Sequence, residues 1–226
     1  MCVREYKMEN FEKWNEEMFK KWGNEERYIK NNFIVRFVEK KRVQDLLKGL
    51  NGDEKEILEM GCGNGFILSR IKFGKKTGVD FSKTAIKSCK DKFNGLSDFE
   101  FFYGDVEKVD LKKKFDAVIC SEVLEHVNNP DKAIDNMIKH SNGKILISIP
   151  NDKLTDFLKK TLIKLRIFDI FFKGLPRETN EWHIHNFTFN SMKNLLKDKV
   201  EIVKIKKSPW FFLPLKYVVY CRVKDF

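Results

Sequence analysis

The sequence lacks two features that would direct the chain into or across a membrane. It contains no run of roughly eighteen apolar residues, the length that a transmembrane helix needs. Its first ten residues include several charged ones and have no apolar region of the kind that a secretion signal carries. We therefore expect a cytoplasmic protein.

Cysteine is scarce and its spacing excludes the common metal and redox motifs. The five cysteines form no CxxC pair and no spacing typical of a zinc site. Several lie in apolar segments, where a free cysteine behaves as a small hydrophobic side chain. Internal repeats and low-complexity linkers are absent as well, and 42% of the residues are hydrophobic, which is typical of a globular protein.

Positive charge is abundant. Lysine and arginine number 44 against 33 acidic residues, which gives a net charge of +11. Such a balance suits nucleic acid, a membrane surface or an acidic substrate as a partner. The basic residues are mostly lysines interspersed with acids, however, and this pattern favours a solvated surface.

The first fifty residues predict two amphipathic helices. Phe11, Trp14 and Phe19 recur at helical spacing, and a second apolar pattern runs to Leu47 beyond a break at Gly23-Asn24. Such stripes pack on a core. Because these precede the first strand, we expect residues 1–50 to form helices that cap the active site.

Residues 51–226 alternate between strand and helix patterns. This predicts an α/β fold with a doubly wound, Rossmann-like sheet, mostly parallel and with helices on both faces. A C-terminal antiparallel hairpin ends the sheet, and a helical insertion lies at about 152–182. The expected strands are 57–60, 76–79, 99–103, 115–120, 144–149, 200–206 and 216–223, and the expected helices include 66–72, 82–92 and 130–140.

A glycine-rich loop follows the first of these strands. Glu59 precedes Gly61, Gly63 and Gly65, whose lack of a Cβ lets a ligand approach the backbone. Asp80 ends the next strand, at the distance along the chain where a carboxylate binds ribose hydroxyls. The glycine spacing differs from GxGxxG, and the leading acid would repel a pyrophosphate. The loop therefore favours a cationic, phosphate-free nucleoside.

This loop and three later motifs resemble the class I S-adenosylmethionine-dependent methyltransferases, and the flanking sequence is similar to their quinone-biosynthesis O-methyltransferase subgroup. The resemblance implies S-adenosyl-L-methionine as the cofactor. It places Asp80 on the ribose, Phe81 beside the adenine, Asp105 on the adenine amino group and the Val106 backbone along the ring. The cofactor-binding residues that it implies are Glu59, Gly61, Cys62, Gly63, Gly65, Asp80, Phe81, Asp105, Val106 and Glu122.

Glu122, Glu125 and His126 stand at positions i, i+3 and i+4 after the fourth strand. On a helix they would share one face at the edge where open α/β sheets bind ligands. Three interpretations remain open: a structural loop, His126 as the catalytic base, or a divalent metal held by the three residues. RNA 3′-terminal 2′-O-methyltransferases resemble this segment and carry a later histidine ligand, a role that His183 or His185 would fill here.

The insertion carries an apolar stripe flanked by lysines. We expect a helix packed on the core or on a second subunit, a lid over the acceptor, or a basic amphipathic surface lying on a membrane. The stripe comprises Leu154, Phe157, Leu158, Leu162, Leu165, Phe168 and Phe172.

The acceptor is the part of the function that no motif names. The resemblance implies methyl transfer to a small-molecule or lipid-like acceptor, at oxygen, by in-line displacement. The alternatives are an RNA methyltransferase and a non-catalytic cofactor-binding partner subunit.

Overall fold

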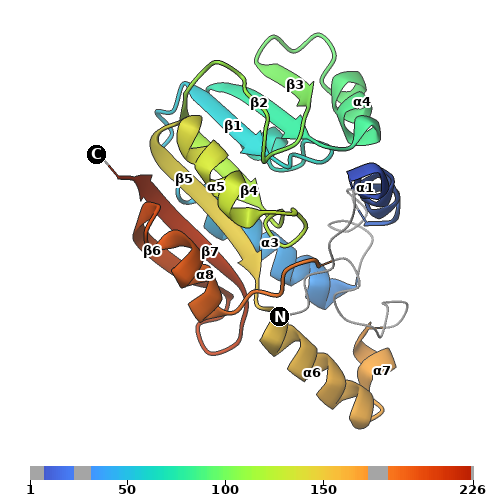
Figure 1. The fold of residues 1–226 in the computed structure, drawn as a ribbon. Coiled ribbons are helices and arrows are strands. Elements are labelled where there is room, and N and C mark those ends of the chain that lie inside the picture. The colour runs from blue at the N-terminus through green and yellow to red at the C-terminus, as the bar shows by residue number, and fades with distance from the viewer. Residues whose placement is uncertain (1–7, 23–31, 173–182, 225–226) are drawn as a thin grey trace.

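The computed structural model describes residues 8–22, 32–172 and 183–224 (Figure 1). The predicted break at Gly23-Asn24 lies outside these ranges. One seven-stranded sheet forms the centre, in the order β3-β2-β1-β4-β5-β7-β6. The strands are β1 Glu56–Met60, β2 Lys75–Asp80, β3 Phe99–Tyr103, β4 Phe115–Ser121, β5 Ser141–Pro150, β6 Val200–Pro209 and β7 Pro214–Val223.

The strand directions confirm the predicted doubly wound architecture. The first five strands pair in parallel, and β7 pairs antiparallel with both β5 and β6. The order reverses beside β1, so the carboxyl ends of β1 and β4 flank the crevice where such sheets bind ligands. That crevice positions the site described below.

Helices cover both faces of the sheet, as expected. One core cluster joins α5 and α8 to the sheet, and a second joins α3 and α4 to its other face. The helices are α1 Met8–Trp22, α3 Phe33–Leu47, α4 Lys83–Lys92, α5 Pro130–Lys139, α6 Asp152–Lys164, α7 Phe168–Phe172 and α8 Phe189–Leu196. None of these helices has the length and apolarity needed to cross a membrane.

The helix predicted for residues 66–72 is wrong. The segment after the glycine-rich loop forms turns and a single 3₁₀ turn, η1 Leu68–Arg70. The Ser69 hydroxyl and the Arg70 guanidinium both donate to the carbonyl of Phe66. Side chains that occupy a backbone acceptor in this way compete with helical hydrogen bonding.

The two N-terminal helices take different places. Helix α1 packs against α4, whereas α3 packs against β5, β6 and β7. Of these two helices, only α1 is placed to form the cap predicted for residues 1–50.

The insertion is helical where it is described. Phe168 is buried, but Phe157 and Leu165 are 64% and 60% exposed. Most of the stripe is therefore only partly covered by the rest of the described chain.

Candidate active site at the carboxyl ends of β1 and β4

The glycine-rich loop is bound to the end of β2. The amides of Gly61 and Cys62 both donate to the carbonyl of Val79, at 2.8 and 2.9 Å. Gly61 has a φ of +77°, and a Cβ there would lie 2.2 Å from a methyl group of Val123. Only glycine satisfies both the backbone angle and this close approach.

Asp80 closes the loop from the other side. One of its carboxylate oxygens accepts from the Gly63 amide at 2.7 Å, and the other accepts from the Ser82 amide at 2.9 Å. Burial raises the pKa of Asp80 in spite of these donors. The Phe81 ring stacks on Tyr103 with 5.6 Å between centroids. The Asp80 carboxylate and the Phe81 ring are therefore both held in place at the end of β2. Their contacts with ribose and adenine stay predictions.

Glu59 is a buried carboxylate whose hydrogen-bonding capacity is not fully satisfied. Its side chain is 2% exposed, and Oε2 accepts no hydrogen bond from any described residue. Desolvation raises its pKa well above the usual value. An unsatisfied buried acceptor beside the loop suits a ligand that brings cationic or N–H groups.

Cys62, Asp105 and Val106 are the remaining residues before β4 that the resemblance assigns to the cofactor. The Cys62 thiol is buried in the core beside Gly78, so its side chain faces away from the loop surface. The Asp105 carboxylate accepts a hydrogen bond from the backbone amide of Glu107 at 2.9 Å, and the side-chain amide of Asn136 donates to the Val106 carbonyl at 3.0 Å. Asp105 and Val106 are therefore held in a fixed turn.

Helix α1 lies against the glycine-rich loop, the start of α4 and the turn after β4. Glu16 accepts from the amides of Lys83 and Thr84 at the start of α4. The Phe19 ring reaches within 3.8 Å of the position that a Gly63 Cβ would occupy, and the Trp14 ring lies 6.3 Å from that of His126. Residue spacing indicated the aromatic stripe, but no pattern in the sequence indicated the contacts of Glu16.

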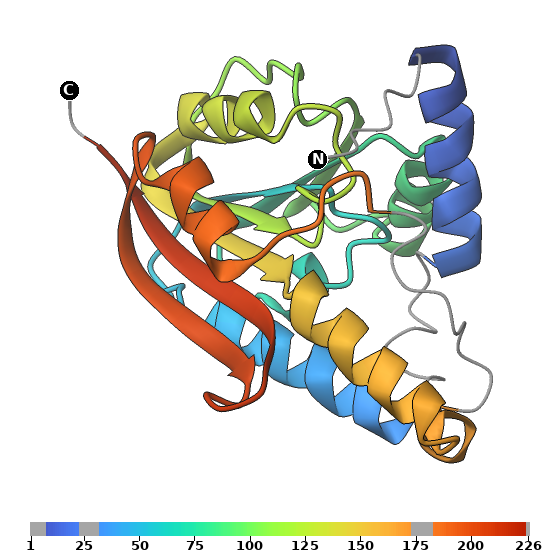
Figure 2. The same cartoon turned by 60° about the horizontal axis from the view of Figure 1, so that its bottom comes forward.

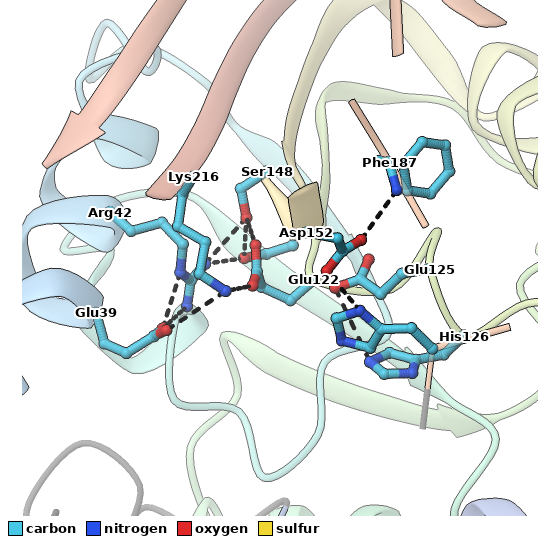
Figure 3. A network of polar contacts seen from close by, with 11 residues as sticks. Glu39, Arg42, Glu122, Glu125, His126, Ser148, Asp152, Phe187 and Lys216 are labelled. Atoms are coloured by element: carbon cyan, nitrogen blue, oxygen red, sulfur yellow. Dashed lines mark hydrogen bonds and ion pairs between the residues drawn. The ribbon is translucent and has the colours of Figure 1, made fainter. Parts of the chain in front are cut away.

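The segment after β4 is a turn, so the shared helical face expected for Glu122, Glu125 and His126 does not form. Glu122 has a φ of +58°, in the left-handed region that non-glycine residues seldom adopt. This angle separates the Glu122 side chain from the next two polar residues (Figure 3).

Glu122 belongs to a first cluster that contains two cations and two carboxylates. Its oxygens contact the Ser148 hydroxyl at 3.2 Å and the ammonium of Lys216. Arg42, which is 1% exposed, pairs with Glu39 at 2.8 Å and donates to Ser148 at 3.0 Å. Arg42 also donates to the hydroxyl of Ser121, and Lys216 lies 3.7 Å from Glu39.

Glu125 and His126 belong to a second cluster with His183. One ligand atom from each residue lies within 4.8 Å of the other two. The His183 ring is hydrogen-bonded to the Asp152 carboxylate at 2.8 Å, and Asp152 also accepts a hydrogen bond from the backbone amide of Phe187. Desolvation and the nearby Glu122 raise the pKa of Glu125 well above its usual value. The cluster can act as a base or hold a divalent cation.

His185 takes no part in this second cluster. Its ring contacts the carbonyl of Val127 at 3.0 Å, and its amide donates to the Glu125 carbonyl at 3.1 Å. Of the two later histidines, His183 is the one that faces Glu125 and His126. No pattern in the sequence indicated that Arg42, Asp152 or Lys216 would lie at this site.

The structure has a doubly wound sheet that ends in an antiparallel hairpin, with Glu59 before a glycine-rich loop and Asp80 at the end of the next strand. This is the class I methyltransferase architecture that the sequence motifs predicted. The comparisons with known proteins agree. The methyltransferase domain family matches residues 51–207. A ubiquinone biosynthesis O-methyltransferase of Rickettsia conorii is 28% identical over 157 residues, which cover 67% of this chain and 53% of the relative. The matched stretch thus spans about half the length of that relative.

Solved structures show the same fold. The magnesium protoporphyrin IX methyltransferase of Synechocystis aligns with a TM-score of 0.65 at 16% identity, over 92% of this chain and 98% of that one. The N-methyltransferase NodS of Bradyrhizobium japonicum aligns with a TM-score of 0.67 at 15% identity, over 93% and 99% of the two chains. The chain belongs to the class I S-adenosylmethionine-dependent methyltransferases. As a member of this family the chain uses S-adenosyl-L-methionine as its cofactor, as the sequence motifs predicted.

Proposed function

We propose that this protein methylates an oxygen atom of a small, apolar acceptor, and that His126 removes the acceptor's proton. Bound S-adenosyl-L-methionine supplies a methyl group on a positively charged sulfur, which is already activated for displacement. The chain has to hold the acceptor oxygen in line and take its proton. The observation that carries the proposal is the His126 imidazole beside Glu125, His183 and Trp14, next to the cofactor crevice.

A positioned base favours oxygen as the methylated atom. A hydroxyl is a weak nucleophile until it loses its proton, whereas a neutral amine already carries a free electron pair. Imidazole titrates near neutral pH and suits this role. The name of the Rickettsia conorii relative, an O-methyltransferase, supports the same direction.

We assign the cofactor contacts to the end of β1, the glycine-rich loop and the segments that follow β2, β3 and β4. Glu59 and the backbone of Gly61, Cys62, Gly63 and Gly65 would face the methionine part, with Glu122 at the end of β4. Asp80 would bind the ribose, and Phe81, Asp105 and Val106 would surround the adenine. The unsatisfied Glu59 oxygen supports a cationic ligand, and α1 would cover it.

Calorimetry with S-adenosylhomocysteine tests the cofactor contacts. We expect Asp80→Ala to weaken binding strongly, since it removes both a ribose acceptor and the acceptor for the Gly63 amide. Ser88→Ala, at an exposed position of α4, serves as the control. Undiminished affinity in Asp80→Ala would contradict the assignment.

Transfer of label from methyl-labelled cofactor tests the acceptor class. A catechol, an aniline of the same ring size and a short RNA with a free 3′ end are offered in parallel. The proposal expects label in the catechol alone. Label in the RNA supports the RNA alternative, and cofactor binding without turnover on any acceptor in cell extract supports the non-catalytic subunit.

A second candidate mechanism is assistance by a divalent metal. The Glu125, His126 and His183 cluster supports it, because carboxylate and imidazole ligands suit Zn²⁺ and Mn²⁺. Titration with each metal alone, followed by calorimetry, should give binding that His183→Ala abolishes and Glu122→Gln preserves. Full activity in EDTA would remove this mechanism and leave the base mechanism intact.

A further inference from the structure

The turn between β6 and β7 exposes three consecutive large aromatic side chains. Trp210, Phe211 and Phe212 are 38%, 78% and 81% exposed. Leaving such side chains in water forgoes the favourable free energy of burying them. A contiguous exposed apolar surface of this kind marks an interaction site.

The start of α3 extends the same surface. Phe37 is 38% exposed and stacks on Trp210 with 5.4 Å between ring centroids, and Trp210 in turn stacks near Phe212 at 6.1 Å. Phe33 is 80% exposed and lies one helical turn before Phe37, on the same side of α3. We name the set Phe33, Phe37, Trp210, Phe211 and Phe212 the aromatic tip.

The insertion adjoins the aromatic tip. Helices α3 and α6 and the β6–β7 turn gather at one end of the molecule in both views, away from β3 and α4 (Figures 1 and 2). The insertion adds three exposed apolar side chains at that end, Phe157, Leu165 and Ile170.

Among the described residues, the charges around the aromatic tip are mainly positive, although Asp169 of α7 is exposed as well. On α3 the exposed charges are those of Arg36 and Lys40, because both carboxylates of that helix, Glu39 and Asp45, are buried. The Lys207 ammonium lies 4.5 Å above the Phe211 ring. Helix α6 and the turn after it add exposed Lys153, Lys160, Lys164 and Arg166.

We propose that the aromatic tip docks on the surface of an anionic lipid bilayer. Aromatic rings insert at the boundary between headgroups and acyl chains, while long basic side chains keep their charges at the anionic headgroups. Each cation near such a surface adds attraction that salt weakens. Because the carboxylates of α3 are buried, the exposed charge at this end of the molecule is positive and complements an anionic surface. The inference does not depend on the identity of the methyl acceptor.

Sedimentation with vesicles tests the docking surface. The full chain is mixed with vesicles of phosphatidylcholine alone and of phosphatidylcholine with phosphatidylglycerol, at low and high salt. We expect binding to the anionic vesicles that high salt weakens. The double variant Phe211→Ser/Phe212→Ser should bind about tenfold less tightly or worse. Arg36→Glu/Lys40→Glu should lose mainly the salt-dependent part.

A matched control uses exposed apolar residues at the other end of the molecule. Leu96 and Phe102 are 50% and 42% exposed, and Leu96→Ser/Phe102→Ser should bind vesicles like the wild type. Unchanged affinity for S-adenosylhomocysteine shows that each variant is folded.

Three outcomes would overturn the proposal. The wild type fails to bind anionic vesicles, or the Phe211→Ser/Phe212→Ser variant binds as well as the wild type. Alternatively, analytical ultracentrifugation shows a dimer that this variant dissociates without any vesicle binding, which would assign the surface to a second copy of the chain.

Discussion

Two carboxylate clusters lie side by side after β4, and they are neutralised in different ways (Figure 3). The first sets Glu39 and Glu122 against Arg42 and Lys216, so two negative charges meet two positive ones. The second sets Glu125 and Asp152 against histidines, whose charge depends on pH. The charges of the first cluster therefore balance one another without a ligand. Those of the second cluster balance only where the histidines are protonated.

The difference assigns different roles to neighbouring carboxylates. Arg42, Ser121 and Ser148 connect α3, β4 and β5, so the first cluster ties three elements together beneath the site. In the second cluster, Glu125 Oε2 accepts no hydrogen bond from any described residue. A buried polar group left in this state is a candidate for a functional role.

Replacing His126 should give the largest effect. His126→Gln removes the proposed base and keeps a polar side chain, so kcat should fall by about 10²–10⁴-fold. Cofactor affinity should stay unchanged, as measured by calorimetry. His185→Gln is the control, because that ring contacts the Val127 carbonyl outside the second cluster. Equal losses of kcat per folded molecule in both variants would refute the role of His126.

Breaking the first cluster should damage folding rather than chemistry. Arg42→Met leaves Glu39 buried without its closest cation, and removing one partner of a buried pair costs about 3–5 kcal/mol of unfolding free energy. Urea unfolding followed by fluorescence measures the loss. Arg36→Met, exposed on the same helix, should change stability by less than about 0.5 kcal/mol. A loss below about 1 kcal/mol for Arg42→Met would show that the first cluster is dispensable for folding.

The sheet could be predicted because its signals are local. Strand β3 spans the predicted residues 99–103, and the predicted 115–120 became Phe115–Ser121. Alternation of strand and helix then restricts the topology, and the C-terminal pair lacks a helix between its strands. The loop acids Glu59 and Asp80 could be found for the same reason, since their positions follow from single strand ends.

The separation of the two carboxylate clusters could not be predicted. It depends on the backbone angle of one residue, Glu122, and no residue type signals a positive φ for glutamate. The partners of the first cluster are also remote in the sequence: Arg42 and Ser121 are 79 positions apart, and Glu122 and Lys216 are 94 positions apart. Spacing within a motif carries no information about such contacts.

Glu59 is a third buried carboxylate near this site, and its Oε2 accepts no hydrogen bond from any described residue. Its pKa is raised above 4.5 by desolvation, so between pH 4.5 and the folded value the unfolded chain loses a proton that the folded chain keeps. The stability of the wild type should therefore fall as the pH rises through this window. Glu59→Gln removes the titration, so its stability relative to the wild type should increase with pH. Urea unfolding at several pH values measures the difference, and parallel curves would contradict it.

Lys41 gives the smallest expected effect and separates pairing from burial. It stands next to Arg42 on α3 and pairs with Asp45, but its side chain is 33% exposed against 1% for Arg42. Lys206 lies 3.7 Å from the same carboxylate and would partly replace it. Lys41→Met should therefore cost less than about 1 kcal/mol in urea unfolding, as partly exposed pairs do. A loss equal to that of Arg42→Met would mean that charge pairing on α3, rather than desolvation of Arg42, governs the stability of the first cluster.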